Sequence, residues 1–250
     1  MQTTQHPLQL LVRKLELSSF LDEEARAAIL ALPFTLRTLE PSTYVLREGD
    51  EPAACAVLVS GFAYRQKTTY VGARQIVSLH IPGEALDFQN LYLDVADHSV
   101  QMLTRGEIAQ IKRAEMQALI EQNVHVARAV LVHMLIEASI FREWILNVGR
   151  RDAQTGLAHF LCEFGVRMDA MGLATEYGYT LPMTQEQLGD TLGLTPVHVN
   201  RTLKTLEARG LIKRNGRDVS FPEWQVMRGA SDFNQRYLHL EPQQATRPRA

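Results

Sequence analysis

Cysteine is scarce in this chain of 250 residues. Its two cysteines, Cys55 and Cys162, lie far apart in the sequence and in no CxxC spacing. One chain therefore cannot assemble a disulfide framework or a four-cysteine iron–sulfur cluster, and we expect two ordinary buried thiols. The sequence also lacks a nucleophile elbow, a phosphate-binding loop and an HExxH helix, which excludes the enzyme classes that depend on those motifs.

Excess charge and long apolar runs are lacking too. The chain carries 26 Lys and Arg against 28 Asp and Glu, a formal net charge of −2, so any affinity for nucleic acid must come from a local patch. No apolar stretch is expected to approach about 20 residues, and the N-terminus has no signal-peptide pattern. These absences predict a cytoplasmic protein without a membrane partner. The hydrophobic content of 46% is enough to form real cores.

The N-terminal half has the pattern of a β-rich domain behind a helical cover. Residues 7–31 predict two short amphipathic helices, the second with Asp22 as its N-cap. Between residues 34 and 111, short apolar or alternating runs such as CAVLVSG and QIVSLHI are separated by turn signals. Many short strands at regular spacing predict a β-sandwich or roll, which places the first domain at residues 1–112.

A helical period begins near Arg113 and predicts a dimerisation helix over residues 113–150. Apolar positions there alternate in steps of four and three, the spacing of a coiled-coil seam about three heptads long. Val130 and Trp144 widen the stripe, as expected if the helix also packs on its own β-domain. A single buried core helix is the alternative. The predicted dimer seam consists of Ala127, Leu131, Met134, Ala138, Phe141, Ile145 and Val148.

A helix-turn-helix pattern stands out in the predicted C-terminal domain, residues 151–232. Thr184 and Gln187 form a capping-box pattern at the start of one helix. Thr195 and Pro196 form the N-cap and N1 pair of a second helix. The short segment between the two helices contains a glycine that is free to adopt a positive φ. This arrangement predicts two helices joined by a tight turn.

A predicted hairpin and a basic cluster follow the second helix. Asn215-Gly216 lies between two apolar-rich runs, which is the strongest short-range hairpin signal. Between residues 195 and 217, six basic residues oppose the single acid Glu207. Phosphate binding is expected here, and a solvated basic face is the alternative. The segment 233–250 is predicted to be a partly disordered tail.

These features together predict a winged helix-turn-helix that binds double-stranded DNA. The polar side of the second helix, residues 196–209, is expected to read base edges, while hydroxyls and cations around it bind phosphates. The predicted base-reading residues on this helix include His198, Asn200 and Arg201. The predicted phosphate-binding residues include Thr184, Thr195, Lys204, Lys213, Arg214 and Arg217.

The stretch TQEQLGDTLGLTPVHVNRTLKTLEARGLI strongly resembles the DNA-binding domain of the cyclic-AMP receptor protein/Fnr (Crp/Fnr) regulators. The EGD turn, the SGFA strand start, the PGE loop and the long helix follow in that family's order. The resemblance implies an α+β fold: an N-terminal β-roll like a cyclic-nucleotide-binding jelly roll, a long dimerisation helix and a C-terminal winged helix-turn-helix. It also implies a homodimer that binds a palindromic operator and recruits or blocks RNA polymerase.

The resemblance also assigns roles to single residues. The family's recognition arginine falls on Arg201, which implies a bidentate contact to guanine. Val197 stands where many members have glutamate, and Pro196 stands where arginine is frequent, so we expect a half-site that differs from the commonest one. Val197 and Pro196 complete the five predicted base-reading residues, and Val197 could contact a thymine methyl group. Gln185 resembles family positions that bind the phosphate backbone.

The residues of the predicted β-roll argue against a cyclic nucleotide. Asp87-Phe88-Gln89 occupies the family's Gly-Glu-Leu position, and His98-Ser99 occupies its Arg-Ser position. An acid where a small residue should admit phosphate, and a neutral histidine in place of arginine, both disfavour an anionic ligand. The candidate effector pocket nevertheless comprises Asp87, Phe88, His98 and Ser99.

No cofactor or metal ion is predicted, and the chain is not expected to be an enzyme. A haem group, another small molecule and no effector at all are the alternatives for the roll. A metal-dependent cupin is the competing enzyme, but His80 and His98 stand alone, without the paired spacing of a cupin. A winged helix that contacts proteins is a second competing function. The candidate axial haem ligands are His80, His98, His125 and His133.

Overall fold

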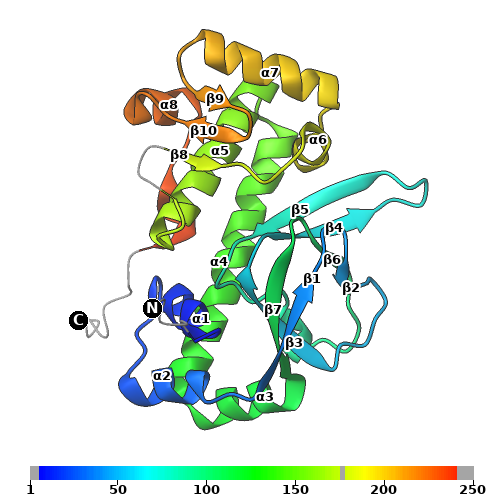
Figure 1. Ribbon diagram of the computed structural model, residues 1–250, viewed down its shortest axis with the longest axis vertical. Helices are drawn as coiled ribbons and strands as arrows, with labels where there is room; N and C mark the ends of the chain where they lie inside the picture. The colour runs from blue at the N-terminus through cyan, green and yellow to red at the C-terminus, as the bar shows by residue number, and fades with distance from the viewer. Residues whose placement is uncertain (1–5, 175–177, 241–250) are drawn as a thin grey trace. The chain divides into compact units, whose positions relative to one another are not determined.

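The computed structural model describes residues 6–174 and 178–240, and the chain divides into two compact units. The N-terminal unit is formed mainly by the residues up to Arg65 and by Leu79–Ala138. The C-terminal unit is formed by Gln66–Ser78 and Ser139–Leu238. Figure 1 shows the order of the elements along the chain.

Two short helices, α1 (Gln9–Glu16) and α2 (Glu23–Leu30), form the predicted N-terminal cover. The Asp22 side chain accepts a hydrogen bond from the backbone N–H of Ala25 at 2.8 Å, which confirms it as the N-cap of α2. The apolar faces of both helices belong to a core cluster that also includes Cys55 and Val57. The cover therefore completes a hydrophobic core of the β-domain.

The strands predicted between residues 34 and 111 are present, and they form two sheets. One sheet has the order β1-β7-β3, and the other has the order β2-β6-β4-β5. A short 3-10 helix, η1 (Phe88–Leu91), lies between strands β5 and β6 along the chain. The strands are β1 (Phe34–Leu39), β2 (Tyr44–Leu46), β3 (Ala54–Ser60), β4 (Ala63–Thr68), β5 (Arg74–His80), β6 (Ser99–Met102) and β7 (Gly106–Lys112).

Strand β3 has a continuous apolar run because both of its faces are buried. Cys55 and Val57 belong to the core shared with the helices, whereas Ala56 and Leu58 belong to a second core cluster. Because successive side chains of a strand point to opposite faces, both faces of β3 are buried. The N-terminal unit therefore has two apolar layers separated by the sheet β1-β7-β3, as a roll requires.

The predicted helix over residues 113–150 is two helices, α3 (Arg113–Gln122) and α4 (Val124–Gly149). The break falls at Asn123, whose backbone is extended. Its side chain accepts hydrogen bonds from the backbone N–H groups of His125 and Val126, at 3.0 and 3.1 Å, and so caps α4. The prediction of one uninterrupted helix is therefore wrong, because an asparagine cap restarts it.

Among the described residues, α4 is the one helix long and apolar enough to cross a membrane. This finding corrects the expectation that no apolar stretch approaches that length. Ala129 and Val130 on one face of α4 are buried in the N-terminal core, as predicted for Val130. Trp144 packs differently from the prediction: its indole N–H donates to Glu163, 3.0 Å away, because this part of α4 belongs to the C-terminal unit.

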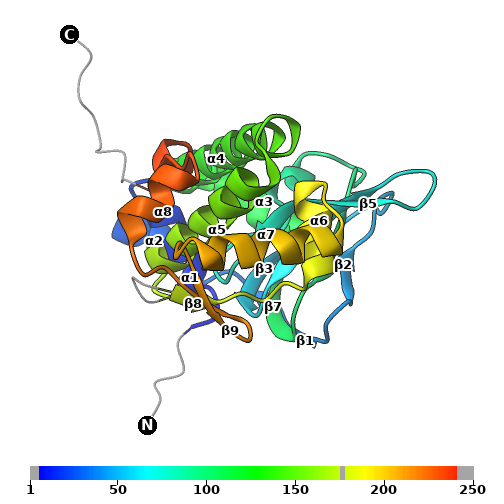
Figure 2. The same ribbon diagram turned by 90° about the horizontal axis from the view of Figure 1, so that it is seen from above.

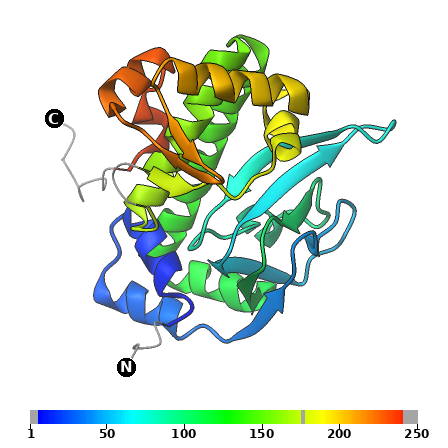
Figure 3. The same cartoon turned by 45° about the horizontal axis from the view of Figure 1, so that its top comes forward.

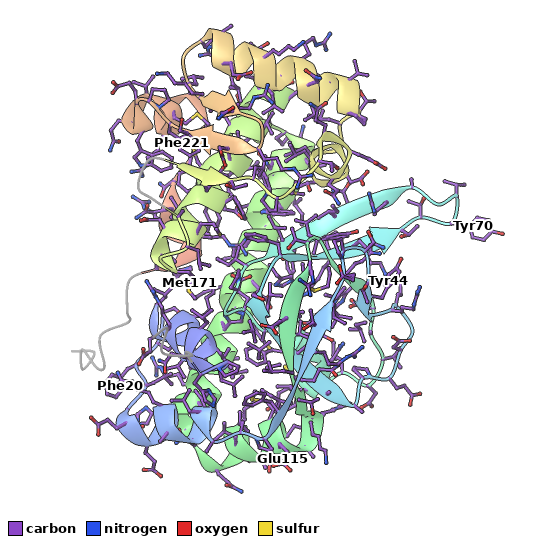
Figure 4. The ribbon with its side chains drawn as sticks, viewed as in Figure 1. Phe20, Tyr44, Tyr70, Glu115, Met171 and Phe221 are labelled. Atoms are coloured by element: carbon purple, nitrogen blue, oxygen red, sulfur yellow. The ribbon has the colours of Figure 1, made fainter. Side chains whose placement is uncertain are left out.

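The C-terminal unit is a winged helix-turn-helix, as predicted. Its short sheet has the order β8-β10-β9, and Phe221, labelled in Figure 4, follows directly after β10. The Phe221 ring packs on that of Tyr179 with ring centroids 5.7 Å apart. Its elements are α5 (Ala153–Ala170), β8 (Gly178–Thr180), α6 (Gln185–Leu192), α7 (Pro196–Ala208), β9 (Lys213–Asn215), β10 (Asp218–Ser220), α8 (Trp224–Ala230) and η2 (Gln235–Leu238).

The predicted tail begins as an ordered segment. Phe233 and Leu238 are buried, and the Phe233 ring packs edge-on against His159 of α5 with centroids 5.3 Å apart. The hydroxyl of Tyr237 donates to Glu163 at 2.8 Å. The side chains of Phe233 and Leu238 therefore belong to the core of the C-terminal unit. Positions 241–250 of the predicted tail lie outside the described residues.

Candidate DNA-binding surface

The two helices of the helix-turn-helix begin at the predicted caps. The Thr184 hydroxyl accepts from the backbone N–H of Gln187 at 3.2 Å, and the Gln187 side chain accepts from the backbone N–H of Thr184 at 2.8 Å. The Thr195 hydroxyl accepts from the backbone N–H of His198 at 3.2 Å, with Pro196 in the first turn. Both starts use bonds within three residues, so the sequence fixes them locally.

Two glycines set the crossing of α6 and α7. Gly193 adopts φ +67° at the end of α6, a conformation that side chains disfavour. A Cβ atom at Gly189 would lie 2.4 Å from the backbone oxygen of Leu194, far closer than atoms can approach. Glycine is required at Gly189 because the backbone of the turn lies against α6 there. This geometry holds the N-terminus of α7 in a fixed direction.

Helix α7 buries one face and leaves the opposite one open. Val199 and Leu206 are fully buried, whereas the side chain of Val197 is 80% exposed. Arg201 and Lys204 are exposed as well, and the spacing of 197, 201 and 204 places them on one stripe of the helix. In the view of Figure 2, no other element of the C-terminal unit lies over α7. The helix therefore presents a polar and basic surface.

The five predicted base-reading residues divide into two groups on α7. Pro196, Val197 and Arg201 are exposed. His198 and Asn200 are half-buried at the sides of the helix. Lys204, which was predicted to bind phosphate, is exposed on the same stripe of α7 as Val197 and Arg201.

The wing carries further basic residues. Gly216 takes φ +61° in the turn between β9 and β10, as the predicted hairpin requires. Lys213 and Arg217 are exposed, whereas Arg214 is half-buried and forms an ion pair with Glu207, 2.6 Å away. Figure 3 shows the orange wing close to the gold helix α7. Of the other predicted phosphate-binding residues, Thr184, Thr195 and Lys204 are exposed and Gln185 is half-buried.

Helix α4 presents an exposed apolar face, but not on the predicted seam alone. Leu131, Ile145 and Val148 are exposed, whereas Ala127, Ala138 and Phe141 are half-buried. Met134 packs against the core of the N-terminal unit. Sequence reasoning missed Leu135 and Leu146, which are 59% and 43% exposed. The four-residue step from Leu131 to Leu135 was the available signal.

The predicted effector-pocket residues make contacts within the protein. Asp87, Phe88 and His98 are buried. The Phe88 ring packs edge-on against His133 of α4, with centroids 5.5 Å apart. His98 Nε2 lies 3.7 Å from a carboxylate oxygen of Asp87. The Ser99 hydroxyl accepts a hydrogen bond from the backbone N–H of Glu48 at 3.0 Å.

A buried arginine that sequence reasoning missed lies beside these residues. Arg65 of β4 is 2% exposed, and its Nε and Nη2 donate to the backbone oxygen of Leu86 at 3.0 and 2.7 Å. Its Nη1 lies 3.1 Å from Glu137 of α4. Burial raises the pKa of Glu137, but Arg65 together with His133 and His80 lowers it by more, and the net shift is downward. The guanidinium thus links the segment before Asp87 to α4.

Burial also shifts the pKa values of acids and histidines in this interior. It raises the pKa of Asp87 to about 7 and lowers that of His80 to about 4. It lowers the pKa of His98 and His133 as well. The candidate haem ligand His125 is instead partly exposed, 3.4 Å from Asp22. Within residues 6–174 and 178–240, no three His, Cys, Asp or Glu side chains are grouped to hold a metal ion.

A β-roll in the same chain as a capped helix-turn-helix with a basic wing defines a DNA-binding transcription regulator. Two family models match the two halves of the chain. The cyclic nucleotide-binding domain matches residues 36–123, and the Crp-like helix-turn-helix domain matches residues 157–229. The chain belongs to the Crp/Fnr family of transcriptional regulators. Because this family consists of regulators and not enzymes, the prediction of no enzymatic activity is confirmed and the cupin alternative is excluded.

Relatives of known class agree with this assignment. The transcriptional activator protein FnrL of Cereibacter sphaeroides is 28% identical over 72% of this chain and 73% of its own length. The probable transcriptional regulator flp of Lacticaseibacillus casei is 29% identical over 80% of this chain and 88% of its own length. The structure of FixK2 from Bradyrhizobium japonicum has the same fold, with a TM-score of 0.73 and 24% identity over 80% of this chain and 98% of that chain.

Proposed function

We propose that this regulator is a cytoplasmic homodimer that binds a palindromic operator through helix α7 of each subunit. The exposed stripe of Val197, Arg201 and Lys204, opposite the buried face of α7, is the observation that carries the proposal. Arginine can donate two hydrogen bonds to guanine in the major groove, and a valine methyl can contact thymine. The exposed cations of the wing supply affinity for phosphates of any sequence.

Helix α4 supports the dimer. Leu131, Leu135, Ile145 and Leu146 expose apolar surface along one helix, and a second copy of α4 would bury it. The C-terminal part of α4 belongs to the same compact unit as α7. Pairing of two α4 helices would therefore fix the separation of two α7 helices, which a palindromic operator with half-sites about one helical turn apart requires.

We further propose that DNA binding needs no cyclic nucleotide or iron–sulfur cluster. Asp87 disfavours an anion, and Arg65 already uses three nitrogen atoms on Leu86 and Glu137. The protein then needs no bound cofactor to join the roll to α4. RNA polymerase is the proposed partner at the promoter, because the family acts on transcription.

Selection of bound sequences from random duplexes tests the proposal, followed by affinity measurements on the selected operator. Arg201→Ala is expected to weaken operator binding about 10- to 100-fold and to relax selection at one base pair of each half-site. Lys213→Ala is the matched control, and it should weaken specific and random DNA alike. Wild-type protein that ignores duplexes at low salt, or selected sequences without two-fold symmetry, would contradict the proposal.

A further inference from the structure

We propose that Arg214 is a positioning residue of the wing and not a phosphate contact, and that Glu207 is its anchor on the recognition helix. This inference rests on the proposed DNA-binding function and refines the role of one residue in it. It gives Arg214 a different role from the phosphate contact that the sequence predicts. Two separate features of the wing support it.

The first feature is the alternation of exposure along β9. Lys213 and Asn215 are exposed, whereas Arg214 between them is half-buried. Arg214 is paired with Val219 of β10, which is 2% exposed. Cross-strand partners project from the same face of a sheet, so Arg214 faces the interior of the C-terminal unit with Val219. Lys213 points to the opposite face, where a phosphate can reach it.

The second feature is the ion pair itself. Nη2 of Arg214 donates to Oε2 of Glu207 at 2.6 Å, and the two side chains are 21% and 32% exposed. Glu207 lies in the last turn of α7 and is the single acid between residues 195 and 217. Nε of Arg214 is buried and has no hydrogen-bond partner among the described residues. The guanidinium is therefore directed toward the helix, with its charge balanced by a carboxylate.

The consequence is a fixed distance between the reading helix and the wing. β9 is a strand of only three residues, and its ladder to β10 holds it on one side. The pair Arg214–Glu207 joins it to α7 across a separation of seven residues. Lys213 and Arg217 then meet phosphates at a set position relative to the bases that α7 reads. Arg214 itself neutralises no phosphate.

The salt dependence of DNA binding separates the two roles. A cation that contacts phosphate changes the slope of log K against log salt by about 0.9 when it is removed. Lys213→Met, the matched control from the neighbouring position, removes one such cation from each subunit of the dimer and is expected to change the slope by about 1.8. Arg214→Met is expected to weaken binding about two- to fivefold with an unchanged slope. Arg214→Lys, which keeps the charge, should also keep the slope and recover part of the affinity if an ion pair holds the wing.

A double-mutant cycle with Glu207→Gln gives a second test, because the two roles predict opposite signs. Removing the acid lessens repulsion of DNA in either background. If Arg214 positions the wing, the change in DNA affinity caused by Glu207→Gln is less favourable in the wild-type background, where it breaks the ion pair, than in the Arg214→Met background, where the pair is already lost. The difference between the two backgrounds should be about two- to fivefold. If Arg214 contacts phosphate, freeing it makes the change more favourable in wild-type protein.

Three outcomes overturn the inference: a slope change in Arg214→Met equal to that in Lys213→Met, a coupling of the opposite sign, or no coupling at all. Each requires that wild-type protein binds its operator. Failure of the inference is therefore distinct from failure of the proposed function, in which the wild-type protein itself would not bind duplex DNA.

Discussion

Replacing Arg65 by methionine is expected to lower the free energy of unfolding by about 3 kcal/mol. Removing one partner of a buried ion pair costs about 3–5 kcal/mol, because the other charge stays buried and unpaired. Arg65 is 2% exposed, but the Glu137 side chain is 14% exposed and keeps some hydration, which favours the lower end of that range. The backbone oxygen of Leu86 also loses both of its guanidinium donors.

Urea denaturation of the full chain, followed by far-ultraviolet circular dichroism, measures the loss. The double variant Arg65→Met/Glu137→Leu is the matched control, because apolar replacement of both charges is often neutral or stabilising. We expect the double variant to recover most of the stability that Arg65→Met loses. A single variant that loses less than about 1 kcal/mol, or a double variant less stable than the single one, would refute the reasoning that this pair is buried and coupled.

The same double variant separates stability from regulation. The proposed function requires no ligand between the roll and α4, so the variant, once folded, should still bind operator DNA without added small molecules. An electrophoretic shift or anisotropy titration at constant salt measures this. Binding that appears only after addition of a cyclic nucleotide would contradict the proposed independence of effector.

Further predictions concern the roll, the turn and the dimer. The folded state keeps a proton on Asp87 up to about pH 7, whereas an unfolded aspartate loses it near pH 4. The free energy of unfolding, relative to that of Asp87→Asn, should therefore decrease as the pH rises from about 4 to about 7. Urea titrations at several pH values measure this, and a difference that stays constant with pH would contradict it. Gly189→Ala places a Cβ 2.4 Å from the Leu194 oxygen and should lower the melting temperature, whereas Gly149→Ala, in open space, should not. Leu135→Asp puts charge into the exposed apolar face of α4 and should give monomers by light scattering, an expectation that an unchanged mass would refute.

Features that depend on neighbours along the chain could be predicted from residue order. Asp22, Thr184 and Thr195 cap helices because each side chain meets a backbone N–H three residues ahead, and such bonds follow from local residue order. Gly193 and Gly216 have a positive φ because their turns require it. The strands of the roll and both helices of the DNA-binding motif followed from the same local rules.

Which charges meet, and which face of a helix remains exposed, depends on contacts between distant parts of the folded chain. Arg65 pairs with Glu137, which lies far away in the sequence, and no local pattern indicates that partner. In the sequence Arg214 cannot be distinguished from the other cations of the wing, whereas in the folded chain it is paired with the buried Val219 and faces inward. On α4, the adjacent residues Val130 and Leu131 are buried and exposed respectively, because only one side of the helix packs against the rest of the protein. Side-chain partners distant in sequence are set by the folded chain, since only there are their positions fixed.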